Sequence, residues 1–164
     1  MFKVGDYVIY RKDVCKLAEI RKNKMNNKDY YLLIPINDNT LKIDVPTDNR
    51  MGYLRSLISL DEVNSLINRI PDIEIVDTDD KLLENTYKRL LDTGSHEDLI
   101  KIIKTTYVRN KKRLDNNKKI SEKDNNYFNS AEKYLYNEFS CVLGLSYLET
   151  KEYVVKKVEE LVNV

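Results

Sequence analysis

The chain has 164 residues, enough for one domain or two small ones, and its hydrophobic fraction of 41% permits a buried core. Its net charge of +1 excludes a uniformly basic nucleic-acid-binding protein, so any site for a polyanion must be a local patch. The sequence shows no signal peptide and no long apolar run, and its two cysteines are far apart, so we expect a cytoplasmic protein without a membrane span or disulfide.

Residues 1–58 are predicted to form a small sheet. Apolar, aromatic and β-branched residues alternate or run together in four segments, at 7–10, 14–20, 30–36 and 41–46. Asn and Asp at 26–29 and 37–39 are turn residues between these segments. Four or five short strands in this length favour a small SH3-like or Tudor-like barrel.

From residue 59 the spacing of apolar residues changes from 2 to about 3.6, which indicates helices. Four helix starts carry Ser-x-x-Glu or Ser-x-x-Asp, at Ser59, Ser95, Ser121 and Ser146. The predicted helices are 60–68, 79–92, 96–113, 122–142 and 147–162, with Gly94 and Gly144 at helix ends. The expected fold is α+β: a barrel at 1–58, a short helix and linker at 59–78, and a helical domain at 79–164 that is a candidate for DNA binding.

Catalytic chemistry is not indicated. The chain has four glycines and no Gly-rich phosphate loop, and His96 is its only histidine, at a helix start where a surface or capping role is expected. Cys15 and Cys141 are expected to be small buried apolar residues. We therefore predict a binding protein, not an enzyme, without a cofactor or a metal site.

One segment of the helical half is strongly basic. Residues 101–119 carry eight Lys or Arg against the single Asp115, whereas residues 59–164 as a whole hold 17 against 20 acidic residues. A helix end with this imbalance attracts polyanions. Two structural explanations stay open: the cations cap helix carbonyls, or they pair with the acids at 122, 124 and 132.

Five segments of the sequence carry a resemblance to a known family. Four lie in the first half: FKVGDYVIY at 2–10, VCKLAEI at 14–20, and the YYLLIPI and LKIDVP segments that follow. The fifth is SEKDNNYFNSAEKYLYNEFSCVLGLSYLETKEYVVKKV at 121–158. In this order they resemble the first four strands and the last two helices of the CarD/CdnL family of bacterial RNA polymerase-binding transcription regulators. The resemblance implies that a monomer docks its Tudor-like barrel on the polymerase β subunit. Its helical domain would contact promoter DNA near the upstream edge of the transcription bubble and alter open-complex stability.

The resemblance also implies which residues form the two sites. The polymerase site would be at Lys22, Asn23, Lys24, Met25, Lys42 and Asp44, where Asn23 and Asp44 stand at positions that are basic in the family. Met25 is expected either in an apolar contact with the partner or in a turn without one. A strand edge near these residues would bind the partner by strand addition.

The DNA site departs from the family pattern, because family members insert a Trp into the minor groove and this chain has no Trp. Asp79, Asp80 or Lys81 takes that place, and an aspartate cannot act as an apolar wedge. Either Leu82 or Tyr87 substitutes, or the DNA contact is mainly ionic. The expected phosphate-binding residues are Lys88, Arg89, Arg109, Lys111, Lys112, Arg113, Lys118 and Lys119. The alternative is a polymerase-bound protein–protein adaptor with little or no DNA contact.

Overall fold

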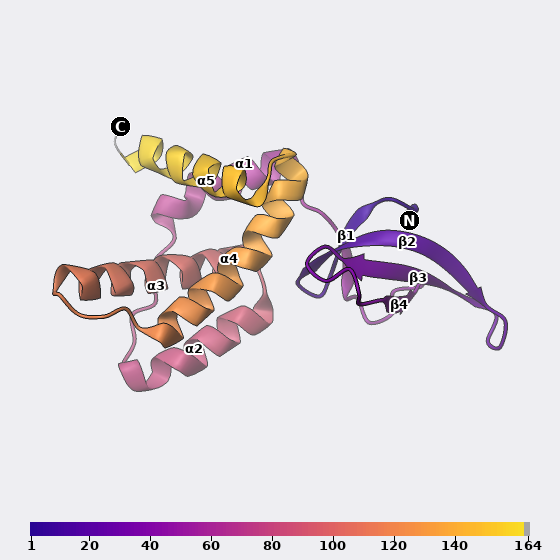
Figure 1. Cartoon of the computed structure of the whole chain (residues 1–164), viewed down its shortest axis with the longest axis horizontal. Helices are drawn as coiled ribbons and strands as arrows, with labels where there is room; N and C mark the ends of the chain where they lie inside the picture. Colours follow the sequence, from indigo (N-terminus) through magenta and orange to yellow (C-terminus); the bar gives the residue numbers. More distant parts are fainter. Residues whose placement is uncertain (163–164) are drawn as a thin grey trace. The chain divides into compact units, whose positions relative to one another are not determined.

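The computed structural model describes residues 1–162 and divides into two compact units, Met1–Ile58 and Ser59–Val164 (Figure 1). The first unit is an antiparallel sheet and the second is helical, so the protein is α+β with an N-terminal sheet and C-terminal helices. The division falls where the spacing of apolar residues changes from strand-like to helix-like.

The first unit is a five-stranded antiparallel sheet with strand order β4-β3-β2-β1-β5. Its strands are β1 (Tyr7–Tyr10), β2 (Asp13–Asn23), β3 (Lys28–Pro35), β4 (Ile43–Pro46) and β5 (Leu54–Ser56). The register of β2 against β3 shifts between Leu17 and Glu19, which is the mark of a β-bulge. The β2–β3 hairpin is much longer than its neighbours and projects beyond them (Figure 1).

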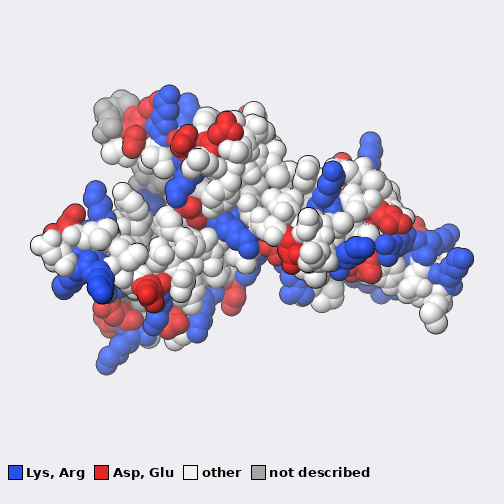
Figure 2. Space-filling view, in the orientation of Figure 1, with Lys and Arg blue, Asp and Glu red and all other residues white. Residues whose placement is uncertain are grey.

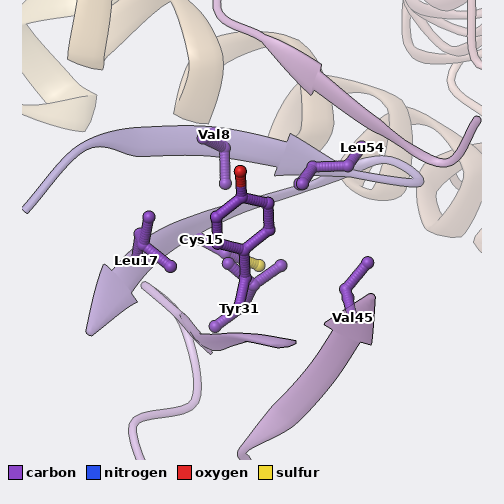
Figure 3. Close-up of a cluster of buried hydrophobic side chains, with 7 residues drawn as sticks. Val8, Cys15, Leu17, Tyr31, Val45 and Leu54 are labelled. Atoms are coloured by element: carbon purple, nitrogen blue, oxygen red, sulfur yellow. The ribbon is translucent and has the colours of Figure 1, made fainter. Parts of the chain in front are cut away.

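The sheet curls around a cluster of buried side chains (Figure 3). Val45 on β4 and Leu54 on β5 belong to this cluster, although these strands are opposite edges of the sheet. Side chains from both edges can meet only if the sheet is strongly curved. Cys15 is fully buried in the cluster, as predicted, whereas Cys141 in the second unit is only half-buried.

The helices of the second unit begin and end close to their predicted positions. They are α1 (Leu60–Arg69), α2 (Asp80–Thr93), α3 (His96–Asp115), α4 (Glu122–Leu143) and α5 (Tyr147–Val162). Each of the four predicted serines accepts a hydrogen bond from the backbone N–H three residues later, at 3.1 to 3.2 Å. Gly94 and Gly144 adopt left-handed backbone angles after α2 and α4, as predicted.

Helix α4 packs along α3 and also contacts α5 and α1 (Figure 1). Its apolar side chains Ala131, Leu135 and Phe139 are almost completely buried. The same helix buries several polar side chains, including the carboxylates of Asp124 and Glu132. Buried carboxylates require partners. The partner of Asp124 is Arg109, one of the residues predicted to bind DNA.

Residues 69–78, which the sequence indicates as a linker, are tied to α3 within the second unit. A short 3-10 helix, η1 (Ile70–Asp72), follows α1. Lys104 Nζ donates to the carbonyl oxygen of Ile70 at 2.7 Å and also to that of Ile73. The N–H of Val76 donates to Thr105 Oγ1 at 2.9 Å. Of the helices within residues 1–162, none combines the length and the apolarity needed to cross a membrane.

Candidate functional site

The tip of the β2–β3 hairpin carries the side chains predicted for polymerase binding. Asn27 turns the chain with a φ of 55°, and its N–H donates to the Asn23 carbonyl oxygen at 2.9 Å. Asn26 Nδ2 donates to the hydroxyl oxygen of Tyr30 at 2.9 Å. These bonds order the tip and leave Met25 fully exposed, at 97% of its free surface. Met25 is thus a turn residue whose apolar side chain is available to a partner.

A surface depression of about 330 Å³ is lined by residues from three neighbouring strands. Lys22 and Asn23 reach it from β2, Asp44 from β4 and Tyr30 from the strand between them. Arg21 completes the lining, because its backbone pairs with Tyr30. Three of the residues predicted for the polymerase site therefore share one surface.

The other three predicted polymerase residues lie near this depression without lining it. Lys24 and Met25 are in the hairpin turn, and Lys42 immediately precedes β4. The sequence missed Arg21 and Tyr30. The period of two along a strand could have placed Arg21 on the face of Asn23, but the pairing of β2 with β3 cannot be read from the sequence.

Two strand edges lie beside the depression. Strand β4 is one edge of the sheet, and its backbone pairs with β3 on one side. Strand β2 pairs with β1 through Asp13–Lys16, and its outer half, up to Asn23, has no strand on that side among residues 1–162. Exposed backbone N–H and C=O groups on such edges can bind an added strand.

The hairpin surface is basic. Lys and Arg side chains gather along the outer part of the β2–β3 hairpin (Figure 2). Arg21 Nε contacts Glu19 at 3.2 Å, with both side chains about half exposed. Asp44 lines the same depression as Arg21. A cation from β2 and a carboxylate from β4 are thus both present at this surface.

In the second unit, two cations of the basic segment are used inside the structure. Arg109 Nε donates to the buried Asp124 carboxylate at 2.8 Å, and its NH1 contacts Asp80 at 3.3 Å. These contacts agree with the ion-pair explanation for Arg109, and they leave it unavailable to phosphates. Desolvation lowers the pKa of Lys104, whose ammonium group is committed to the carbonyl oxygens at η1.

The remaining predicted DNA-binding residues are on the surface. Lys88 and Arg89 are exposed on α2, and Lys88 lies 3.8 Å from Glu84 one turn earlier. Five others gather at the end of α3 and in the loop after it: Lys111, Lys112, Arg113, Lys118 and Lys119. Within residues 1–162, none of these five is within 4.0 Å of an acidic side chain in an ion pair. Figure 2 shows blue side chains at this end of α3, at the left of the view.

Exposed apolar side chains accompany these cations. Tyr107, Leu114 and Ile120 are 41% to 58% exposed and line a depression of about 270 Å³ together with Lys111. The sequence did not identify this group. The resemblance suggested Leu82 or Tyr87 as the apolar wedge in place of a Trp. Leu82 is exposed, whereas Tyr87 is completely buried and cannot reach DNA, so that prediction is wrong for Tyr87. Burial, and then the nearby Asp124 carboxylate, raise the pKa of the Tyr87 hydroxyl.

His96 and Cys15 both pack against neighbouring side chains of their own units. His96 Nε2 lies 2.8 Å from Glu138 Oε1, and its ring stacks on Phe139. Within the described residues, no three His, Cys, Asp or Glu side chains could together hold a metal ion. Burial raises the pKa of the Cys15 thiol to about 11, which makes its thiolate scarce at neutral pH.

Comparison with protein-family models and with curated proteins produced no match for this chain.

Proposed function

We propose that the protein is a transcription regulator of the CarD/CdnL type. Its N-terminal sheet, which we interpret as a Tudor-like barrel, docks on the β subunit of bacterial RNA polymerase. Its helical unit contacts promoter DNA near the upstream edge of the bubble and alters the stability of the open complex. The observation that carries the proposal is the depression on the first unit, where Lys22, Asn23 and Asp44 lie together beside open strand edges.

Docking would use strand addition. A strand of the partner pairs with β4 or with the outer half of β2, and main-chain hydrogen bonds then supply affinity. The charged side chains around the depression select the partner and steer its approach. Met25 at the hairpin tip adds an apolar contact, since its side chain is fully exposed.

DNA contact would be mainly ionic. The five cations at the end of α3, of which Arg113 is half-buried and the other four are exposed, bind phosphates. Phosphates are the same in every sequence, so binding is salt-sensitive and only weakly sequence-dependent. The exposed Leu114 and Tyr107 beside them supply the apolar surface that the missing Trp would otherwise provide. Arg109 has no part in this contact, because it holds Asp124.

The second candidate function is a polymerase-bound adaptor that recruits a protein. It is favoured by an apolar groove of about 320 Å³ between α3, α4, α5 and η1, lined by residues such as Ile100, Tyr136 and Val154. An apolar groove is typical of protein or small-molecule binding and does not suit the phosphates of DNA.

Two measurements test the proposal. Immobilised full-length protein should retain the polymerase β subunit from a cell extract, and loss of that retention in an otherwise folded protein contradicts the docking proposal. Promoter-DNA affinity should fall steeply with salt on a log–log plot. Retention of β with no DNA affinity at low salt would instead support the adaptor.

A further inference from the structure

A second cavity in the first unit, of about 520 Å³, opens where the two edges of the curled sheet approach each other. Its walls come from the end of β1, the start of β3, strand β4 and the loop between β4 and β5. They include Tyr10, Arg11, Lys28, Asp44, Arg50 and Tyr53. Small-molecule sites in proteins have volumes of roughly 300–1,000 Å³. The cavity is therefore large enough for a small organic ligand.

Aromatic and guanidinium planes form one wall. The rings of Tyr10 and Tyr53 meet edge to face, with centroids 6.3 Å apart and an interplanar angle of 89°. The Arg11 guanidinium lies over the Tyr53 ring, 4.4 Å from its centroid. Tyr53 is 38% exposed, so this wall is not part of a closed core. Nucleobases stack on tyrosine rings and on arginine planes of this kind.

The charge of the lining favours an anion. Arg11, Lys28 and Arg50 contribute three cations, against the carboxylates of Asp44 and Asp48. Arg50 Nε lies 3.3 Å from Asp48, which neutralises that carboxylate. A partner's Arg or Lys side chain is the other common ligand of aromatic walls. Such a cation would meet the excess positive charge of the lining.

The cavity is held open by its own hydrogen bonds. Asn49, with a φ of 51°, donates from Nδ2 to the Leu54 carbonyl oxygen at 2.8 Å and accepts from the Leu54 N–H at 3.2 Å. Arg11, with a φ of 60°, donates from its N–H to the Tyr53 carbonyl oxygen at 2.8 Å. A preformed site loses little conformational entropy when a ligand binds.

We propose that this cavity binds a nucleoside phosphate. The base stacks against the Tyr53–Arg11 wall, and Lys28 and Arg50 hold the phosphate. The Asp44 carboxylate accepts a hydrogen bond from an amino group of the base or from a ribose hydroxyl. This chemistry is shared by a free nucleotide and by one nucleotide of a single strand. The proposal does not depend on polymerase docking.

The test is a titration of full-length protein at low salt with AMP, ATP and a single-stranded oligodeoxyadenylate, which carries the same base, followed by NMR or calorimetry. We expect saturable binding. Tyr53→Ala should weaken it about ten-fold, the loss typical of one stacked base. Arg11→Gly should also weaken it, and glycine accepts the φ of 60° at this position without strain. Asp44 is left in place because it also lines the docking depression.

Tyr7→Ala is the matched control. Tyr7 is on the same strand as Tyr10, is 44% exposed and carries Lys16 at 5.9 Å from its ring, but it does not line the cavity. This variant should leave nucleotide affinity unchanged. Tighter binding of AMP or ATP identifies a free nucleotide as the ligand, and tighter binding of the oligonucleotide identifies a single strand.

Three results would overturn the proposal: no saturable binding of any probe to the folded protein, equal weakening by Tyr7→Ala, or full affinity in folded Tyr53→Ala. If Tyr53→Ala does not fold, Arg11→Gly decides in its place, since its turn is preserved. Unchanged nucleotide affinity in Arg11→Gly would then show that the base does not stack against the Tyr53–Arg11 wall.

Discussion

Arginines of the two units differ in what they contact. In the sheet, Arg21 is 48% exposed and its guanidinium contacts the surface residue Glu19. In the helical unit, Arg109 is 29% exposed and joins the buried Asp124 to Asp80. Both residues belong to basic stretches of the sequence. A basic stretch of sequence therefore forms a basic surface patch only where the packing of its strand or helix leaves the cations exposed to solvent.

The comparison is sharpest for Arg109→Ala, which has the largest expected effect. The substitution leaves the buried Asp124 carboxylate without its cation, and the free energy of unfolding should fall by about 3 kcal/mol. Urea unfolding at neutral pH measures this change. Lys112→Ala, at an exposed position on the same helix, should change stability by less than about 0.5 kcal/mol.

The double variant Arg109→Met with Asp124→Leu should recover most of the lost stability, because neither charge then remains buried alone. Full stability in Arg109→Ala alone would show that Arg109 is a surface cation, and it would return to the DNA site.

Met25→Glu tests the sheet side of the comparison. A charge placed in an apolar contact with the polymerase β subunit should cost on the order of 1–3 kcal/mol of binding free energy. The melting temperature should stay the same, because Met25 is fully exposed in the free protein. Quantitative retention of the β subunit measures the effect.

Met51→Glu is the control, as Met51 is 72% exposed in another loop of the same unit. Equal retention by Met25→Glu and by the parent protein would mean that Met25 is a turn residue with no partner.

Lys111→Gln with Lys112→Gln tests the phosphate contact in the helical unit. Loss of two phosphate contacts should reduce the slope of log affinity against log salt by about 2. Lys156→Gln with Lys157→Gln removes the same charge from exposed positions on α5 and should leave the slope unchanged. Equal slopes in both variants would show that only the total charge matters, and would favour the adaptor function.

The smallest expected effect is a difference in alkylation rate between the two cysteines. It compares how readily the two units open locally, because each unit contains one cysteine. Burial raises the pKa of both thiols, so both should react more slowly than free cysteine at pH 8. The half-buried Cys141 should be modified before the fully buried Cys15, as followed by mass spectrometry. Both should react equally in urea. Earlier modification of Cys15 would mean that the sheet opens more readily than the helical unit.

The sequence by itself determined the elements and the order of the two units. Cap residues such as Ser59 and Gly144 act within three or four residues, and the apolar period changes within a few positions at residue 59. These signals are local, so the helix bounds could be predicted to within about two residues. The resemblance similarly placed Lys22, Asn23 and Asp44 in one site, and the fold brings them together.

Only the tertiary structure decided which charged and aromatic residues remain available. Arg109 meets Asp124 from 15 positions away, and Lys104 reaches Ile70 across 34 positions. Helix α2 starts with two acids and carries Tyr87 further along. Tyr87 is buried because its face of α2 turns toward the core. The Tyr53–Arg11 wall likewise depends on β5 pairing beside β1. Such contacts depend on the packing of distant segments, which no local pattern encodes.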